Sequence, residues 1–432
     1  MAPVRERLGC VFGGGLGSQI EIFSHGSIED WRTLYFFALE GDRAAMQRRD
    51  VLGGFALTLI AGFARPVLAQ EGRVIVSKIA LLDGRVVMPV TISGNGPYLF
   101  LLDTGGAGSL IDAKLALELK LQSTGSVRTR DVGGQAVLGS YTARDVIFGG
   151  GARQPVVSLS AIDGGFGPRV RGSLAAGILT TVDSDLDIEA GEWRAYPDGR
   201  PERVGFVKLE RAIRSDSTLG RNAASPRLYG DIQVNGMALE CLLDTGAPGA
   251  ISISYDNARR LGLWDDARPF TPQATSGIGG SGGIGRIVRA DNALFAGQRF
   301  DRPLVLLRGP SDGARGHDGI VGLSMLRGFN LSTEVRTRSL WLQRHSNAAP
   351  LSERYGMSGL WLGNKGNEIR VAVVGTGSPA SAAGIEVGDR ITGLDFRSAI
   401  ANITGAPGKN VELSVEVNGQ ARSVRFALTP FL

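Results

Sequence analysis

Residues 89–121 are PVTISGNGPYLFLLDTGGAGSLIDAKLALELKL, and residues 230–263 are GDIQVNGMALECLLDTGAPGAISISYDNARRLGL. Each stretch begins with alternating apolar and polar residues, turns at a glycine and continues as an apolar strand that ends in Leu-Leu-Asp-Thr-Gly. A short strand and a helical segment follow in both, in the same order. Because an internal repeat fixes the architecture of a chain, the sequence predicts two related half-domains made mainly of β-strands.

A hairpin pattern follows each copy of the repeat. Residues 133–150, GGQAVLGSYTARDVIFGG, correspond to residues 279–297, GGSGGIGRIVRADNALFAG. The glycines expected at the two hairpin tips are Gly133, Gly134, Gly279 and Gly280. Each half is therefore predicted to carry a hairpin at the same place.

The repeat continues to the end of each half. Gly177-Ile178-Leu179 matches Gly319-Ile320-Val321, and DLDIEAGEWRAY and NLSTEVRTRSLWL each predict a final pair of strands. A polar stretch separates the halves. The predicted boundaries are 70–213 for the first half-domain, 214–227 for the linker and 228–344 for the second half-domain.

The composition agrees with a globular protein rich in strands and turns. The 432 residues are 43% hydrophobic and include 63 glycines, enough for a sizeable core in two or three domains. The net charge of +5 comes from scattered arginines without a basic run, so no nucleic-acid partner is predicted. With only Cys10 and Cys241, no disulfide framework is expected, and Cys241 is predicted to be a small buried hydrophobe.

Residues 46–69 have the layout of a signal peptide. Arg48-Arg49 precede an apolar stretch and a small-residue ending before Gln70. The arginine pair resembles a twin-arginine signal, and an ordinary secretory signal is the alternative. We expect residues 1–45 to be an over-extended start of translation or a disordered extension. The apolar stretch is too short for a good membrane span, so the sequence predicts a periplasmic or secreted protein without a stable membrane span.

The two Leu-Leu-Asp-Thr-Gly motifs place a carboxylate, Asp103 or Asp244, at the end of an apolar strand before a sharp turn, where the glycine is expected to supply backbone angles that other residues avoid. If the two turns face each other, carboxylates within about 3 Å cannot both ionise and they share one proton. The ionised group can then take a proton from water while the other donates to a peptide carbonyl oxygen. A duplicated β scaffold without activity is the alternative.

Other catalytic chemistries lack their motifs. After Gln70 the chain has only His317 and His345, without the His-Glu-x-x-His spacing, so no metal site is predicted. Gly277, Gly279 and Gly282 fit a dinucleotide-binding fingerprint, but a strand pattern follows them instead of a helix. No cofactor is therefore expected.

On these motifs the chain resembles the aspartic peptidases, especially the retropepsin-like group, with both halves fused in one chain. The resemblance covers roughly residues 74–344 by motif order. It implies a mainly β, bilobed peptidase of two retropepsin-like half-domains that acts on a polypeptide substrate. It implies that Asp103 and Asp244 are the catalytic pair and that Gly105 and Gly246 permit the turns. Thr104 and Thr245 would exchange hydroxyl-to-backbone bonds between the halves. The hairpins at Gly133-Gly134 and Gly279-Gly280 would be flaps that close over the substrate.

Two departures from the family pattern concern the first half. The family has a hydrophobic-hydrophobic-Gly sequence behind each catalytic loop. Ile320-Val321-Gly322 satisfies it in the second half, whereas the first half has Ile178-Leu179-Thr180, which predicts a distorted first half. Gly106 follows Asp-Thr-Gly where the family usually has Ala, Ser or Thr, which predicts weaker support for Asp103.

Beyond a second linker, residues 356–432 are predicted to form a small separate α+β domain. Residues 359–395 resemble a PDZ domain, best in SPASAAGIEVGDRI, where Ser378-Pro379 begins a short helix. The resemblance implies that Gly359, Leu360, Trp361 and Leu362 form the loop that receives the C-terminal carboxylate of a bound chain. The region after Asp395 is short for the usual second helix, and a small domain that binds nothing is the alternative.

The leading hypothesis is therefore an exported aspartic endopeptidase with a PDZ-like module. The alternative is a non-catalytic periplasmic protein that binds peptides in a degenerate peptidase cleft. Both aspartates and both Thr-Gly pairs are intact, which favours catalysis.

Overall fold

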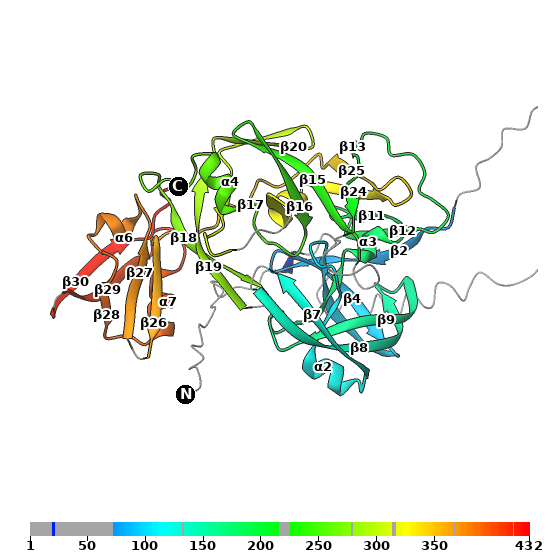
Figure 1. Cartoon of the computed structure of the whole chain (residues 1–432), viewed down its shortest axis with the longest axis horizontal. Coiled ribbons are helices and arrows are strands. Elements are labelled where there is room, and N and C mark those ends of the chain that lie inside the picture. The colour runs from blue at the N-terminus through cyan, green and yellow to red at the C-terminus, as the bar shows by residue number, and fades with distance from the viewer. Residues whose placement is uncertain are drawn as a thin grey trace, which may run out of the picture.

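The computed structural model describes residues 20–21, 72–131, 134–215, 225–277, 280–312, 317–366, 368–417 and 419–432. The predicted signal peptide and most of the segment before it lie outside these residues. Within the described residues the chain is mainly β, as the sequence predicts, and its strands form four sheets (Figure 1).

The first half is built on a nine-stranded sheet with two short helices, α2 (Ala113–Glu118) and α3 (Gly177–Thr180). The sheet buries Met88, Phe100 and Leu102 in the main core. Its strands, in spatial order, are β1 (Ile20–Glu21), β3 (Ala80–Leu82), β4 (Arg85–Ile92), β5 (Asn95–Asp103), β10 (Val170–Ala175), β6 (Leu110–Asp112), β9 (Ala152–Ile162), β8 (Gly134–Phe148) and β7 (Gln122–Asp131).

The second half has a ten-stranded sheet with helices α4 (Tyr255–Arg260) and α5 (Leu323–Leu326). Its main path is β18 (Thr271–Gly277), β19 (Gly280–Arg289), β22 (Leu304–Leu307), β17 (Ile251–Ile253), β23 (Gly319–Gly322), β16 (Met237–Asp244), β15 (Arg227–Val234), β20 (Asn292–Phe295) and β21 (Gln298–Asp301). Strand β14 (Ile213–Arg214) pairs with β15.

The two sheets share one topology, which explains the sequence repeat. The order β4-β5-β10-β6-β9-β8-β7 in the first half corresponds to β15-β16-β23-β17-β22-β19-β18 in the second. In both, the strand that ends at the aspartate runs parallel to a strand from the far end of its half. Equivalent helices also begin alike, because Asp112 and Ser254 accept a bond from a first-turn N–H of α2 and α4.

A six-stranded sheet joins the halves. Its order is β13 (Val207–Leu209), β25 (Ser339–Arg344), β24 (Phe329–Glu334), β11 (Asp183–Asp187), β12 (Glu192–Tyr196) and β2 (Ile75–Lys78). The two predicted final strand pairs are confirmed, and they meet where Leu186 on β11 lies opposite Leu331 on β24.

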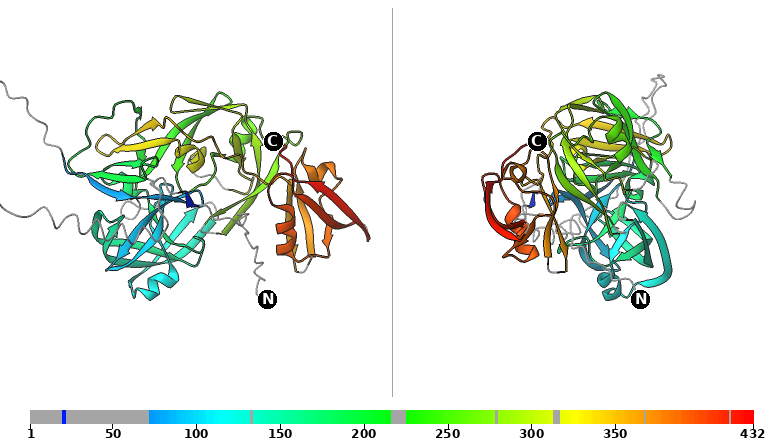
Figure 2. Two further views of the ribbon diagram at one scale, coloured as in Figure 1. Left: turned by 180° about the vertical axis from the view of Figure 1, so that it is seen from behind. Right: turned by 60° about the vertical axis from the view of Figure 1, so that its left-hand side comes forward.

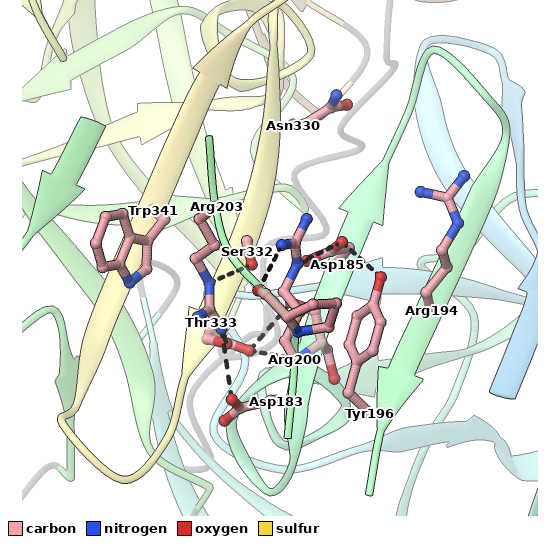
Figure 3. A network of polar contacts seen from close by, with 12 residues as sticks. Asp183, Asp185, Arg194, Tyr196, Arg200, Arg203, Asn330, Ser332, Thr333 and Trp341 are labelled. Atoms are coloured by element: carbon pink, nitrogen blue, oxygen red, sulfur yellow. Dashed lines mark hydrogen bonds and ion pairs between the residues drawn. The ribbon is translucent and has the colours of Figure 1, made fainter. Parts of the chain in front are cut away.

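Two largely buried arginines lie at this junction (Figure 3). The Arg203 guanidinium donates to the Ser332 hydroxyl at 2.8 Å and to the Thr333 carbonyl at 2.7 Å, on the other half of the repeat. Arg200 pairs with Asp185 at 2.7 Å, with only 12% and 6% of the two side chains exposed. The Arg203 bonds cross from the first half to the second, whereas the Arg200–Asp185 pair lies within the first half, at the strand that meets β24.

Residues 360–427 contain a separate five-stranded antiparallel sheet with its own core. It lies beside β18 and β19, on the opposite side of the second half from the six-stranded sheet (Figures 1 and 2). Its elements are β26 (Leu360–Lys365), β27 (Glu368–Val374), α6 (Pro379–Ala382), β28 (Arg390–Thr392), α7 (Phe396–Ile403), β29 (Asn410–Val417) and β30 (Gln420–Ala427). Among the described residues, no helix is both long enough and apolar enough to cross a membrane.

Candidate active site

The two motif aspartates end equivalent strands, Asp103 on β5 and Asp244 on β16. Two backbone N–H groups of each turn donate to one carboxylate oxygen. Asp103 Oδ1 accepts from Gly105 at 3.1 Å and Gly106 at 2.9 Å. Asp244 Oδ1 accepts from Gly246 at 2.8 Å and from Ala247 at 3.2 Å. Each turn therefore fixes its own carboxylate and leaves the second oxygen for other partners.

The structure brings the two carboxyl groups together. A Cβ atom placed on Gly105 would lie 2.3 Å from Asp244 Cγ, and one on Gly246 would lie 2.7 Å from Asp103 Oδ1. The carboxyl group of Asp244 is close enough to raise the pKa of Asp103. Each carboxyl group thus rests on the turn of the other half, where only a glycine leaves enough room.

Gly105 and Gly246 were predicted to permit the turn through backbone angles that other residues avoid, and this reason is wrong. Neither glycine has φ in the left-handed region. The close approach of the opposite carboxylate is what excludes a side chain at both positions.

Two buried threonines link the turns. The Thr104 hydroxyl donates to the Leu243 carbonyl at 2.7 Å, and the Thr245 hydroxyl donates to the Leu102 carbonyl at 2.6 Å. Each hydroxyl oxygen also accepts the other threonine's backbone N–H, at 3.0 and 3.1 Å. The exchange implied by the family resemblance is thus present in the geometry. Four hydrogen bonds fix the separation of the two strand ends.

The prediction of a distorted first half rested on a wrong alignment. The strand beside Asp103 is β10, and Ala175 is the residue opposite Asp103, as Gly322 is opposite Asp244. Gly172 is therefore the counterpart of Gly319. Ile178-Leu179-Thr180 belongs to helix α3 instead. The two halves keep the same strand arrangement, with alanine in place of glycine at one position.

Burial dominates the ionisation of the pair. Burial, followed by the nearby charge of Asp244, raises the pKa of Asp103 to about 7 from an ordinary 3.8, against the lowering effect of the Gly105 and Gly106 donors. Burial likewise raises the pKa of Asp244, although its own N–H donors oppose the shift. Raised pKa values keep one proton on the pair over a wide range of pH.

We expect activity to peak at mildly acidic to near-neutral pH. Gly106 and Ala247 have no side-chain hydroxyl that could stabilise an ionised carboxylate, and burial raises both pKa values. Ala247→Ser adds such a donor and should move the acidic limb of the pH–rate profile to lower pH. A maximum below about pH 3.5, under the reference pKa of an ordinary Asp, would contradict the prediction.

The predicted flap residues are described only in part. Gly133 and Gly279 lie outside the described residues, while Gly134 begins β8 and Gly280 begins β19. The hairpins themselves are confirmed, with Asp131 paired to Gly134 and Gly277 paired to Gly280. Strands β8 and β19 also contact each other, so the two hairpins converge from opposite halves (Figure 1).

One contact at the site has no signal in the sequence. Arg227, at the start of β15, directs Nη1 toward the Gly105 carbonyl at 3.4 Å. Arg227 belongs to the second half and Gly105 to the first, so only the folded chain brings them together. The guanidinium therefore places a positive charge beside the turn that follows Asp103.

Residues 88–181, which include β5, Asp103 and β10, match the sequence model of a family described as aspartyl protease. The protein is an aspartic-type endopeptidase. The family match lies within the first half, and the second half follows the same strand order. A comparison with curated proteins finds no match.

Among solved structures, the peptidase is similar to an aspartic proteinase from Irpex lacteus, with 16% identity and a TM-score of 0.40. That similarity covers 64% of this chain and 99% of the other. A retropepsin-like aspartic protease from Rickettsia conorii is also 16% identical, with a TM-score of 0.23, over 33% of this chain and 96% of the other.

The predicted PDZ-like loop lies in the C-terminal module. Only Gly359, with φ +71°, precedes β26, whereas Leu360, Trp361 and Leu362 belong to that strand, so three of the four residues predicted as a loop are strand residues. A Cβ on Gly359 would lie 2.1 Å from the Ser378 Cβ, so glycine is required there. Ser378 caps helix α6, as its sequence predicts. The region after Asp395, which the sequence indicated to be short for the usual second helix, forms α7.

Proposed function

We propose that the protein is an exported endopeptidase in which Asp103 and Asp244 activate a water molecule to cleave polypeptides. The observation that carries this proposal is the pair of facing carboxyl groups, each resting on a glycine of the other half. Their raised pKa values allow one group to be ionised while the other is protonated.

The arrangement supports hydrolysis without a covalent intermediate. The ionised carboxylate takes a proton from water as the water oxygen bonds to the peptide carbonyl carbon, and the protonated carboxyl donates to the carbonyl oxygen. Transfer of a proton to the amide nitrogen then allows the C–N bond to break, giving a carboxylic acid and an amine. One proton remains on the pair, so the cycle can repeat.

The direct test uses protein that begins at Gln70 and a mixed peptide library. We expect cleavage that a statine-type inhibitor blocks, because its hydroxyl takes the place of the attacking water between the two carboxyl groups. Peptide binding without cleavage at any pH between about 3.5 and 8 would favour the alternative, a non-catalytic peptide-binding protein.

The proposed export rests on the signal-like residues 46–69. A reporter fused after Gln70 should reach the periplasm when translation begins at Met46. Cytoplasmic retention would contradict export, and unchanged transport after Arg48→Lys and Arg49→Lys would assign the general secretory route.

For the C-terminal module we propose capture of an extended chain end. Strand β26 is terminal in its sheet, so within the described residues one of its edges is unpaired, and α7 contacts this strand. Such an edge can accept a peptide as an added strand, and the backbone around Gly359 can receive a carboxylate.

The module is bonded to the base of the β18–β19 hairpin. Thr271 donates its hydroxyl to the Gly356 carbonyl at 2.7 Å, and the Phe270 N–H donates to the Thr376 carbonyl at 3.3 Å. Gly375 lies so close to this hairpin that a Cβ would be 2.0 Å from the Phe270 carbonyl oxygen. A chain end bound at β26 would therefore lie next to the hairpin that we propose as the second flap.

Binding at β26 should require a free carboxylate. Fluorescently labelled peptides with an apolar C-terminal residue are expected to bind the mature protein at least about tenfold more tightly than the same peptides with a C-terminal amide. Fluorescence anisotropy titrations measure the affinity of each peptide. The statine-type inhibitor is present throughout, so that the labelled peptide cannot bind in the active site. Equal affinities for the two peptide forms would contradict this role.

A further inference from the structure

We propose that Ser109 is a positioning residue for Asp103, because its hydroxyl takes the structural place of a backbone carbonyl present in the second half. This inference rests on the proposed catalytic role of Asp103. It concerns how the first catalytic turn is fixed to the strand beside it.

The second half shows the arrangement that Ser109 replaces. Gly322 on β23 lies opposite Asp244, and its N–H donates to the Ala250 carbonyl at 2.9 Å. The next N–H, of Leu323, donates to the Ala247 carbonyl at 2.7 Å. Two backbone bonds thus fix the loop that follows Asp244 to the strand that runs beside it.

The first half keeps only one of these backbone bonds. The Ala176 N–H donates to the Gly106 carbonyl at 3.1 Å, as Leu323 does to Ala247. The Ala175 N–H, however, donates to the Ser109 hydroxyl oxygen at 3.0 Å. A side chain therefore supplies the acceptor for the residue directly opposite Asp103.

A difference of one residue in strand pairing explains the exchange. Ile251, the first residue of β17, lies opposite Val321. The first residue of β6, Leu110, lies opposite Ser173, which is one position further from the aspartate. At the same point of the neighbouring strand, the loop after Asp103 is thus one residue shorter than the loop after Asp244. The Ser109 side chain therefore reaches the Ala175 N–H, which a backbone carbonyl would otherwise accept.

The same difference accounts for Ala175. A Cβ on Gly322 would lie 2.3 Å from the Gly249 carbonyl oxygen and 2.7 Å from the Ala247 carbonyl oxygen. Ala175 carries a Cβ at the equivalent place and is only 4% exposed. Where the second half has Gly322 and a carbonyl acceptor, the first half has Ala175 and the Ser109 hydroxyl. The two differences occur together, which indicates that the first half uses this hydroxyl as the hydrogen-bond acceptor.

Ser109 also ties the turn to a further strand, because its carbonyl accepts the Ser160 N–H at 3.0 Å. Loss of the hydroxyl leaves the buried Ala175 N–H without this acceptor, which is costly enough to shift the loop. The N–H donors of Gly105 and Gly106 lower the pKa of Asp103, so a loosened turn should raise it further.

The test compares Ser109→Ala with Ser109→Thr, which keeps the hydroxyl. Ser173→Ala is the matched control, since Ser173 is buried on the same strand as Ala175 and its hydroxyl has no hydrogen-bond partner among the described residues. Turnover is normalised to active sites titrated with the statine-type inhibitor. A pH–rate profile and a melting curve are recorded for each variant.

We expect Ser109→Ala to lower kcat roughly tenfold and to move the acidic limb of the profile to higher pH. Ser109→Thr should restore both, and Ser173→Ala should leave both unchanged. A Ser109→Ala variant that melts earlier but keeps kcat and the profile would overturn the proposal. Because the wild-type enzyme must first hydrolyse peptide, failure of the proposed catalytic function would show before any variant is compared.

Discussion

Asp103→Asn and Asp244→Asn should each abolish peptide hydrolysis, with kcat lowered by roughly 10⁴-fold or more. The pair carries one proton and needs one ionised and one protonated carboxyl, and an amide can play neither part. The double variant should be no worse than either single one, since residues that act as a unit are strongly non-additive. Initial rates on a cleaved library peptide measure the effect.

These variants should stay folded. An asparagine keeps the oxygen that accepts the turn N–H groups, so the bonds from Gly105 and Gly106, or from Gly246 and Ala247, can persist. Asp145→Asn is the matched control, because Asp145 is paired with Arg153 at the exposed surface of the same half. Near-normal turnover in either active-site variant would exclude the proposed dyad.

Stability provides a second readout with a defined sign. The folded pKa of Asp103, about 7, lies above its ordinary value of 3.8, so the folded state binds more protons than the unfolded state between these values. The native protein should therefore lose stability as pH rises from about 4 to 7. Asp103→Asn removes this charge, so its melting temperature should exceed that of the wild type at pH 7 and approach it at pH 4.

The sequence repeat was enough to predict the parts of the fold that depend on local patterns. Strand and turn order, the two hairpins and the final strand pairs follow from apolar alternation and glycine position, which each segment displays by itself. Cys241 is also confirmed as a buried hydrophobe on β16, where burial raises the pKa of its thiol. The facing of the two turns was a condition for the predicted proton sharing, and the structure meets it.

Strand register could not be obtained in the same way. Gly177-Ile178-Leu179 matches Gly319-Ile320-Val321 in residue type, yet β10 presents Gly172-Ser173-Leu174-Ala175 beside Asp103. The apolar-apolar-Gly pattern is absent there because the shorter loop leaves room for the Ala175 Cβ and brings in the Ser109 hydroxyl. Only the hydrogen-bonded pairing shows that a different set of residues fills the same position.

Long-range contacts account for the other features that the sequence did not indicate. Arg227 meets Gly105 across the two halves, and the Gly375 backbone packs on Phe270 across the module boundary. Neither contact leaves a periodic pattern or a motif, since the partners come from distant segments. The sequence also gave no sign of why positions 105 and 246 must be glycine, because the atoms that a side chain there would clash with belong to the aspartate of the other half.

The second large effect is expected from adding one methyl group to either turn. Gly105→Ala places a Cβ 2.3 Å from Asp244 Cγ and 2.4 Å from its Oδ2, much closer than atoms can approach. Neither the Gly105 nor the Gly246 backbone has φ in the left-handed region, so alanine itself adopts the backbone without strain. The clash must therefore be relieved by moving the carboxylate of the opposite half.

Displacement of Asp244 by about 1 Å should lower kcat at least roughly 10²-fold, because the reacting groups lose their alignment. Gly246→Ala should act in the same way on Asp103, where the Cβ would lie 2.7 Å from Oδ1. Both variants should also bind the statine-type inhibitor more weakly, since its hydroxyl needs both carboxyl groups. Kinetics and inhibitor titration at one pH measure the two effects together.

Each turn offers its own control. Gly108 and Gly249 lie in the same two loops, and a Cβ on either would meet no atom within 4 Å. Gly108→Ala and Gly249→Ala should therefore keep turnover within about twofold of the wild type, since neither glycine lies against a carboxylate. If Gly105→Ala were as active as Gly108→Ala, Asp244 could not rest on the first turn as the structure shows. If all four variants lost activity equally, loop flexibility rather than the contact between the halves would set the geometry of the pair.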